Sequence, residues 1–101
     1  MAVPLRPKRG RPVGSRSFDP RSAEAFGQIV RSAREALGTS QEALAAAAEI
    51  ERSHFSKIER GLSQPTLFAM LKISGALGVP AAVLVEQVEG ELHRRGRRSN
   101  R

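Results

Sequence analysis

The 101-residue chain contains no cysteine, which excludes disulfide bonds and thiolate metal sites. It has no tryptophan or tyrosine and only four phenylalanines. A core must therefore be built mainly from Ala, Leu, Ile and Val, a mixture that favours packed helices over sheets. No apolar run approaches the roughly 20 residues that span a bilayer, and the N-terminus is too polar and proline-rich for a signal peptide. We expect one all-α domain with two tails, in a reducing, cytoplasmic setting and without a membrane segment.

Positive charge is concentrated at the two ends of the chain. The net charge is +7; residues 1–22 carry +5, residues 91–101 carry +4, and residues 23–90 carry −2. A basic tail is either a solvated, disordered flank or a segment that binds a polyanion, because Lys and Arg that neutralise phosphates release counterions. Charge alone leaves both interpretations open.

Residues 1–18 combine Pro and Gly with basic side chains, a composition that cannot bury enough apolar surface to fold. We expect an extended, disordered basic arm there, followed by a folded domain over residues 19–89. Residues 90–101 are expected to form a second basic, disordered tail that frays after Gly90.

Helix signals recur within the expected domain. Asp19-Pro20 supplies a cap and a first turn, and apolar residues at spacings of three and four predict a helix from Pro20 to Leu37. Thr39 and Glu42 stand at capping-box spacing before a short Ala-rich helix, Gln41 to Ala48. The remaining patterns predict helices over residues 51–60, from Pro65-Thr66 to Leu77, and from Ala81 to about Val88. Three of the five helices are followed by glycines that suit a left-handed C-terminal residue: Gly38, Gly61 and Gly78.

The second and third predicted helices have the properties that binding in a DNA major groove requires. They are short and joined by a tight turn, and the later one is polar on most of its faces. It anchors through Phe55 and Ile58, one helical turn apart. Ala45 is small where the two helices cross, and Ile50 fills the space between them.

The segments SQEALAAAAEIERSHFSKIERGLSQPTL and LKISGALGVPAAVL resemble the Cro/lambda-repressor-like, or XRE, family of helix-turn-helix transcriptional regulators. The resemblance covers about residues 26–88. It implies an all-α, five-helix lambda-repressor-like domain with the helix-turn-helix motif at about 41–60. The departure is Glu49, which stands where the family usually has Gly; a positive φ there costs on the order of 1 kcal/mol.

The resemblance also implies that the helix over residues 51–60 enters the major groove of double-stranded DNA. The positions expected to contact bases or phosphates are Gln41, Arg52, Ser53, Ser56 and Lys57. Arg52 is the best candidate for base recognition, because its guanidinium group matches the O6 and N7 acceptors of guanine. An ordinary solvated face is the alternative for Arg52 and Lys57. Arg60 either contacts a phosphate or compensates the helix C-terminus, and Glu59, near Lys57, is expected to pair within the domain.

Residues 7–15, PKRGRPVGS, resemble an AT-hook centred on Arg9-Gly10-Arg11-Pro12. Gly10 lets the backbone lie along a narrow minor groove, Pro12 keeps the chain extended, and Arg9 and Arg11 favour the negative potential over A·T tracts. The alternative is a generic basic arm that contacts phosphates without base preference.

Three functions compete. The first is a sequence-specific repressor or activator, acting as a homodimer through the last helix with Leu84, Val85 and Val88 as the candidate interface. The second is an architectural DNA binder that prefers A/T-rich DNA, and the third is a protein-interaction module such as an antitoxin. We expect no enzyme and no cofactor, because no nucleophile has a paired base and neither His54 nor His93 has a second ligand at metal spacing. The first function places the protein in the cytoplasm, on the nucleoid.

Overall fold

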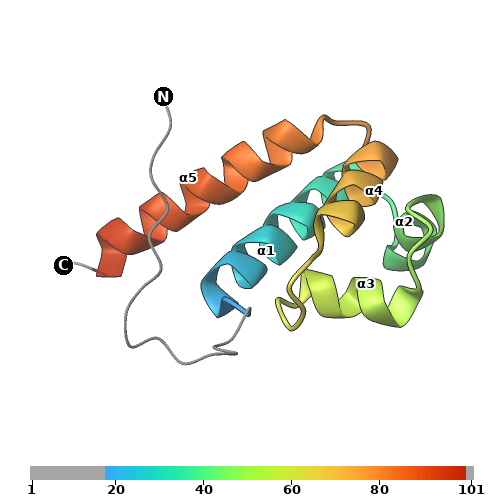
Figure 1. The fold of residues 1–101 in the computed structure, drawn as a ribbon. Helices are drawn as coiled ribbons and strands as arrows, with labels where there is room; N and C mark the ends of the chain where they lie inside the picture. The colour runs from blue at the N-terminus through green and yellow to red at the C-terminus, as the bar shows by residue number, and fades with distance from the viewer. Residues whose placement is uncertain (1–17, 100–101) are drawn as a thin grey trace.

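The computed structural model describes residues 18–99, and within this range the chain folds into five helices without a strand (Figure 1). The helices are α1 (Pro20–Leu37), α2 (Gln41–Ala47), α3 (Arg52–Glu59), α4 (Leu67–Leu77) and α5 (Ala81–Ser99). The predicted all-α, five-helix architecture is confirmed. The AT-hook-like residues 7–15 lie outside the described part of the chain.

The long helix α1 lies at the centre, with α5 beside it on one side and α3 on the other (Figure 1). One hydrophobic cluster contains buried residues from every helix. Its members are Phe26, Val30, Leu44, Ala45, Ala48, Phe55, Ile58, Ala69, Ile73, Leu77 and Leu84. Small and aliphatic side chains dominate it, as the shortage of aromatic residues predicted. Because α3 contacts this cluster through one narrow stripe, the rest of its surface is left outside the core.

The helix starts agree with the sequence to within about two residues, and α2 begins at Gln41 as predicted, but its capping residue differs. Asp19 caps α1 by accepting a hydrogen bond from the Arg21 N–H. The predicted capping box from Thr39 is wrong: Ser40 is the cap, and its hydroxyl accepts from the Ala43 N–H at 3.0 Å. Ser40 has the extended backbone that a cap needs and directly precedes the first helical residue.

The turn after α2 has the strain that the sequence predicted. Glu49 has φ 58°, the only positive φ of a non-glycine residue in the described range. The N–H groups of Glu49 and Ile50 donate to the carbonyls of Ala46 and Ala45, at 3.1 and 2.9 Å. This is the hydrogen-bond pattern of a helix that ends in a left-handed residue, a position that normally favours glycine.

The last helix is longer than predicted. The expected end near Val88 and fraying after Gly90 are wrong, because α5 continues to Ser99. Glu91 is buried at 8% exposure and accepts from Arg95 Nε at 2.8 Å. Arg95 also donates to Gln28 of α1, at 2.8 Å. Since α1 supplies a surface for it, the basic segment folds as a helix that packs against another helix.

The predicted dimer interface on α5 is only partly available. Leu84 is 2% exposed and belongs to the core, so its assignment to an interface is wrong. Val88 packs partly against the core, while Val85 remains 42% exposed.

No single described helix is long and apolar enough to cross a membrane. The helices α4 and α5 have the required length and apolar composition only when taken together, and the angle between them is 107°.

Candidate nucleic-acid interface

A small apolar wedge fixes the angle between α2 and α3. Phe55 and Ile58 on the inner side of α3 are fully buried, and Ala45 of α2 is 1% exposed. Ile50 in the turn is half-buried and packs against the same cluster. The four residues that the sequence assigned to this wedge are therefore brought together.

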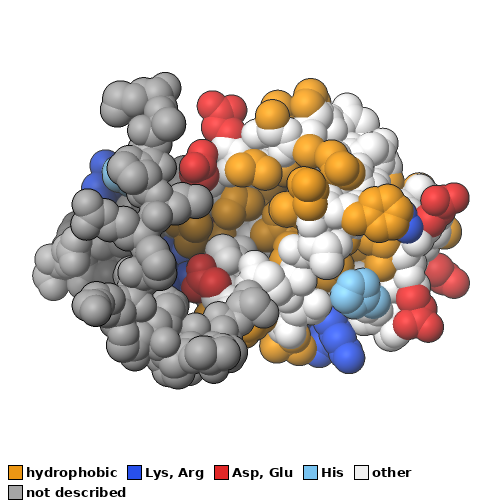
Figure 2. Space-filling view, viewed as in Figure 1, with side chains coloured by type: hydrophobic (Ala, Val, Ile, Leu, Met, Phe, Trp, Pro, Cys, Tyr) orange, Lys and Arg blue, Asp and Glu red, His pale blue; other side chains and the backbone are white. Residues whose placement is uncertain are grey.

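The opposite side of α3 is polar and open to solvent. Arg52, Ser53 and Lys57 are exposed, and Ser56 is half-buried. The Ser53 hydroxyl donates to Glu51 Oε1 at 2.9 Å. Across residues 18–99, the side chains of Arg52 and Lys57 have no hydrogen-bond or ion-pair partner. Basic and histidine side chains gather at the lower edge of the molecule, where α3 runs (Figure 2).

A buried ion pair holds the C-terminal end of α3 to α1. Arg34 Nε donates to Glu59 Oε2 at 2.7 Å, and Arg34 Nη2 donates to Oε1 at 3.1 Å. The side chains of Arg34 and Glu59 are 12% and 1% exposed. The hydrogen bonds that Arg34 donates to the Glu59 carboxylate raise the pKa of Arg34, because they favour its charged form. Glu59 pairs within the domain as predicted, but with Arg34 rather than with Lys57.

Gln41 joins this network. Its side-chain Nε2 donates to Glu59 Oε1 at 2.8 Å, so the first residue of α2 is tied to the last residue of α3. Gln41 is half-buried, and its contact with the DNA backbone stays a prediction. Sequence reasoning missed Arg34, although a signal was present: Arg34 stands four residues after Val30, on the side of α1 that faces the core.

The family model named HTH_3, a helix-turn-helix, matches residues 30–84, which is more than half of the chain. The chain belongs to this helix-turn-helix family. Members of the family are DNA-binding transcriptional regulators, and the resemblance to Cro/lambda-repressor-like proteins is confirmed. In a comparison with curated proteins, nothing matches this sequence.

Several solved structures of helix-turn-helix regulators share the fold. The restriction-modification controller protein C.AhdI from Aeromonas hydrophila is 37% identical over 61% of this chain and 94% of its own, with a TM-score of 0.60. The controller protein C.Esp1396I, solved as a tetramer with its natural 35-base-pair operator, is 25% identical over 70% and 93%, with a TM-score of 0.65. The clp gene regulator ClgR from Corynebacterium glutamicum is 24% identical over 78% and 84%, with a TM-score of 0.73, and shows the fold alone.

Gly27 lets α1 approach the motif's second helix, α3, closely. A Cβ added at Gly27 would lie 2.4 Å from the Ile58 carbonyl oxygen and 2.5 Å from that of Glu59. Sequence reasoning gave Gly27 no role, because a glycine within a helix has no local signal that distinguishes close packing from simple tolerance. The contact places the backbone of α3 directly on α1.

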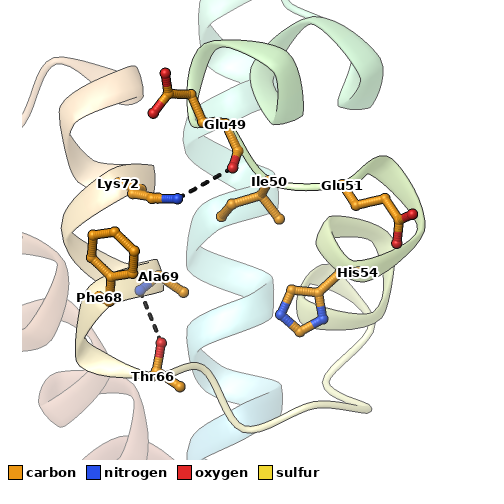
Figure 3. Close-up of a pocket in the computed structure, with 8 residues that line it drawn as sticks. All are labelled: Glu49, Ile50, Glu51, His54, Thr66, Phe68, Ala69 and Lys72. Atoms are coloured by element: carbon orange, nitrogen blue, oxygen red, sulfur yellow. Dashed lines mark hydrogen bonds between the residues drawn. The ribbon is translucent and has the colours of Figure 1, made fainter.

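A cleft of about 390 Å³ opens beside the N-terminal end of α3 in this helix-turn-helix domain (Figure 3). His54 and Phe68 lie on opposite sides of it, from α3 and α4. Lys72 Nζ donates to the Glu49 carbonyl at 3.3 Å and lies 4.3 Å from the centre of the Phe68 ring. Lys72 therefore connects the strained turn to α4.

Over residues 18–99, no three His, Asp or Glu side chains are grouped so that they could hold a metal ion.

The last DNA-contact candidates lie at the end of α3 and in the arm. Arg60 is exposed, and its Nε donates to the Ser56 carbonyl at 3.3 Å, which supports a role at the helix C-terminus. A phosphate contact for Arg60 stays a prediction. The AT-hook-like Arg9-Gly10-Arg11-Pro12 lies outside the described residues, but the point where the arm joins the fold is described, at Phe18 and Asp19.

Proposed function

We propose that this protein is a sequence-specific transcriptional regulator that inserts α3 into the major groove of double-stranded DNA. The observation that carries the proposal is the two-sided character of α3. Phe55 and Ile58 fix it to the core, while Arg52 and Lys57 extend into solvent with no partner among residues 18–99. Because the core fixes the backbone of α3, its cationic side chains can meet phosphates and base edges without a rearrangement of the helix.

The side chains of α3 divide by what they contact. Arg52, at the N-terminal end, donates to the O6 and N7 atoms of a guanine. Ser53 and Ser56 form shorter contacts with base edges or phosphates, and Lys57 neutralises a phosphate as a point charge. The Glu59 network orients Gln41 so that its remaining N–H faces the DNA backbone, and Arg60 contacts a phosphate from the end of α3.

The basic arm contributes a second DNA contact. Arg9, Gly10, Arg11 and Pro12 lie in the minor groove of A/T-rich DNA next to the site bound by α3, which adds affinity that decreases with salt. The position of Phe18 and Asp19, directly before the first residue of α1, supports this proposal, because the arm precedes them in the chain.

The regulator acts as a homodimer through an apolar surface on α4 and α5. This α4–α5 surface consists of Leu67, Phe68, Leu71 and Val85, which are 66%, 66%, 50% and 42% exposed. Hydrophobic side chains gather over these helices (Figure 2). Exposed apolar patches of this kind mark interfaces. The tetramer described for C.Esp1396I with its operator supports self-assembly, and a two-fold dimer implies a palindromic operator.

Selection of bound sequences from random duplex DNA, followed by footprinting, tests this function. We expect a palindromic consensus and an affinity that decreases steeply with salt. Preference for A/T content without a palindrome would favour an architectural DNA binder instead. Co-purification of a second protein with no duplex binding at low salt would favour an antitoxin-like module. DNA binding, rather than catalysis, then places the protein on the nucleoid in the cytoplasm.

A further inference from the structure

The C-terminal end of α5 carries positive charge that the α3 site does not use. Glu91, the one acidic residue after Gly90, is 8% exposed and pairs with both Arg94 and Arg95. The Arg94 side chain is nevertheless 61% exposed. Arg97 is exposed and has no hydrogen-bond or ion-pair partner among residues 18–99. We call Arg94, Arg95 and Arg97 the basic end of α5.

One residue of α1, Glu24, contacts both the segment that follows α3 and the basic end of α5. A Cβ added at Gly61, directly after the C-cap of α3, would lie 2.8 Å from the Cα of Glu24. Arg95 Nη1 lies 3.5 Å from Glu24 Oε1, and Arg95 Nη2 donates to Gln28 at 2.8 Å. Figure 1 shows that α5 ends on the side of the molecule where α1 begins. The basic end of α5 therefore lies beside the C-terminal end of α3.

Two more exposed cations lie at this meeting point. Arg60 is the C-cap of α3 and directly precedes Gly61. Arg21 stands one helical turn before Glu24, on the same face of α1. Arg94 and Arg97 are also one turn apart, so their Cβ atoms are about 5–6 Å from each other on one face of α5. Exposed arginines of three helices thus surround Glu24, a distribution of charge that is typical of surfaces that bind nucleic acid.

We infer that the basic end of α5 is a second DNA-binding surface, which contacts phosphates beside the major groove that α3 enters. The N-terminal residues of a recognition helix meet the bases, so its C-terminal end lies toward the phosphate backbone at the edge of the groove. Arg94 and Arg97 bind phosphates there and recognise no base. The bonds from Arg95 to α1 hold this surface in place before DNA binds. This inference rests on the proposed function, because it needs α3 in the groove.

Fluorescence anisotropy of the full chain, on a selected consensus duplex and on random duplexes at several salt concentrations, tests this surface. Arg97→Gln should weaken binding to both duplexes alike, by roughly three- to eightfold at about 0.1 M salt, and lower the salt slope by about 0.9. Adding Arg94→Gln should about double the change in slope. The selected consensus should stay the same, since phosphates carry no base sequence. Arg97→Lys should restore binding, because a phosphate contact requires only the charge.

The matched control is Arg31→Gln, which also removes one exposed arginine, in this case from α1, where it pairs with Glu35. It should leave the affinity and the salt slope unchanged. An equal loss for Arg31→Gln and Arg97→Gln would reflect net charge alone and would overturn the inference.

Three further outcomes overturn the inference. A role confined to helix stability predicts a lower thermal unfolding midpoint for Arg97→Gln with an unchanged salt slope. Unchanged DNA binding together with weaker binding of poly-glutamate would assign the basic end of α5 to an acidic protein partner. In both cases the proposed function stands, because the full chain still selects a consensus. A full chain that binds no duplex at low salt overturns the proposed function and this inference together.

Discussion

Glu59 is the residue on which the geometry of the DNA-binding motif depends. Its side chain is 1% exposed, and the carboxylate accepts hydrogen bonds from Arg34 of α1 and from Gln41 of α2. A buried charge is tolerated only when partners compensate the lost hydration, and here two N–H groups of Arg34 and one of Gln41 do so. Three helices therefore meet at one side chain, which fixes α3 relative to both of its neighbours.

Glu59→Gln should lower the free energy of unfolding by about 3 kcal/mol, because it leaves the buried Arg34 cation without its counter-charge. The matched control is Glu35→Gln, whose pair with Arg31 joins side chains that are 57% and 62% exposed. That change should cost no more than about 0.5 kcal/mol. Urea unfolding of both variants measures the difference. Equal losses for the two would show that the Glu59 pair contributes no more than a surface pair.

Arg52→Ala should weaken binding to the operator by about 1–3 kcal/mol and relax the preference at one base position, since the bidentate contact to guanine is lost. Lys57→Ala is the comparison, because a phosphate contact should weaken binding to all duplexes alike and reduce the salt slope by about one unit. Fluorescence anisotropy on operator and random duplexes at several salt concentrations separates the two. If Arg52→Ala behaved like Lys57→Ala, Arg52 would contact only phosphate.

The sequence predicted the outward residues of α3 better than the contacts beneath them. Phe55 and Ile58 are one turn apart, so the polar residues between them must face away from the core. The buried pair of Arg34 and Glu59 was not predicted in full, since the two residues are 25 positions apart and only the fold brings them together. Gln41 is a second example of a contact that the sequence could not predict. Its place at the start of α2 was predicted, but its hydrogen bond to Glu59, 18 positions away, was not.

At the scale of the helices, the close distance between α1 and α3 at their crossing depends on the absence of a side chain at Gly27. Gly27 is buried at this crossing, and its backbone faces the last carbonyls of α3. Any larger residue would separate the two helices and shift α3 relative to α2. The helix that we propose enters the major groove is thus positioned by backbone contact as well as by the apolar wedge.

Gly27→Ala and Gly75→Ala should change stability in opposite directions. At Gly27 the new methyl group would lie 2.4 Å from the Ile58 carbonyl oxygen, so we expect a loss of about 2–3 kcal/mol and weaker operator binding. At Gly75, within α4, a Cβ meets nothing within 4 Å. Alanine there should raise stability by about 0.5–1 kcal/mol, because it restricts the unfolded chain and favours the helix. Thermal unfolding measures both, and a destabilised Gly75→Ala would contradict the account of α4.

The C-terminal half of α5 shows why sequence patterns misjudge the ends of helices. Gly90 and a run of arginines predicted fraying, since neither favours an isolated helix. The structure stabilises this segment through contacts distant in the sequence, with Arg95 bound to both Glu91 and Gln28. The other helices were predicted to within a residue or two because caps, glycines and apolar spacing agreed there.

At the scale of the whole molecule, the arginines at the end of α5 lie apart in the chain from the exposed apolar residues of α4 and the start of α5. Arg95 of α5 binds Glu24 and Gln28 of α1, so the basic end of α5 lies along the first half of α1, the half that begins at the base of the arm. The exposed apolar residues are instead concentrated on α4 and the start of α5. The α4–α5 surface includes no residue of α3 and none of the basic end of α5.

Leu71→Asp tests the dimer. Leu71 is 50% exposed and belongs to the α4–α5 surface, so a carboxylate there should cost a monomer little stability but would be buried uncompensated in a dimer. We expect a monomer in analytical ultracentrifugation, with affinity for a palindromic operator reduced at least about tenfold, roughly 1.4 kcal/mol, and affinity for a single half-site unchanged. Leu37→Asp is the control, because Leu37 is 59% exposed and ends α1, outside the α4–α5 surface. An intact dimer for Leu71→Asp would place self-association elsewhere on the molecule, whereas a monomer for both variants would show a general effect of added charge.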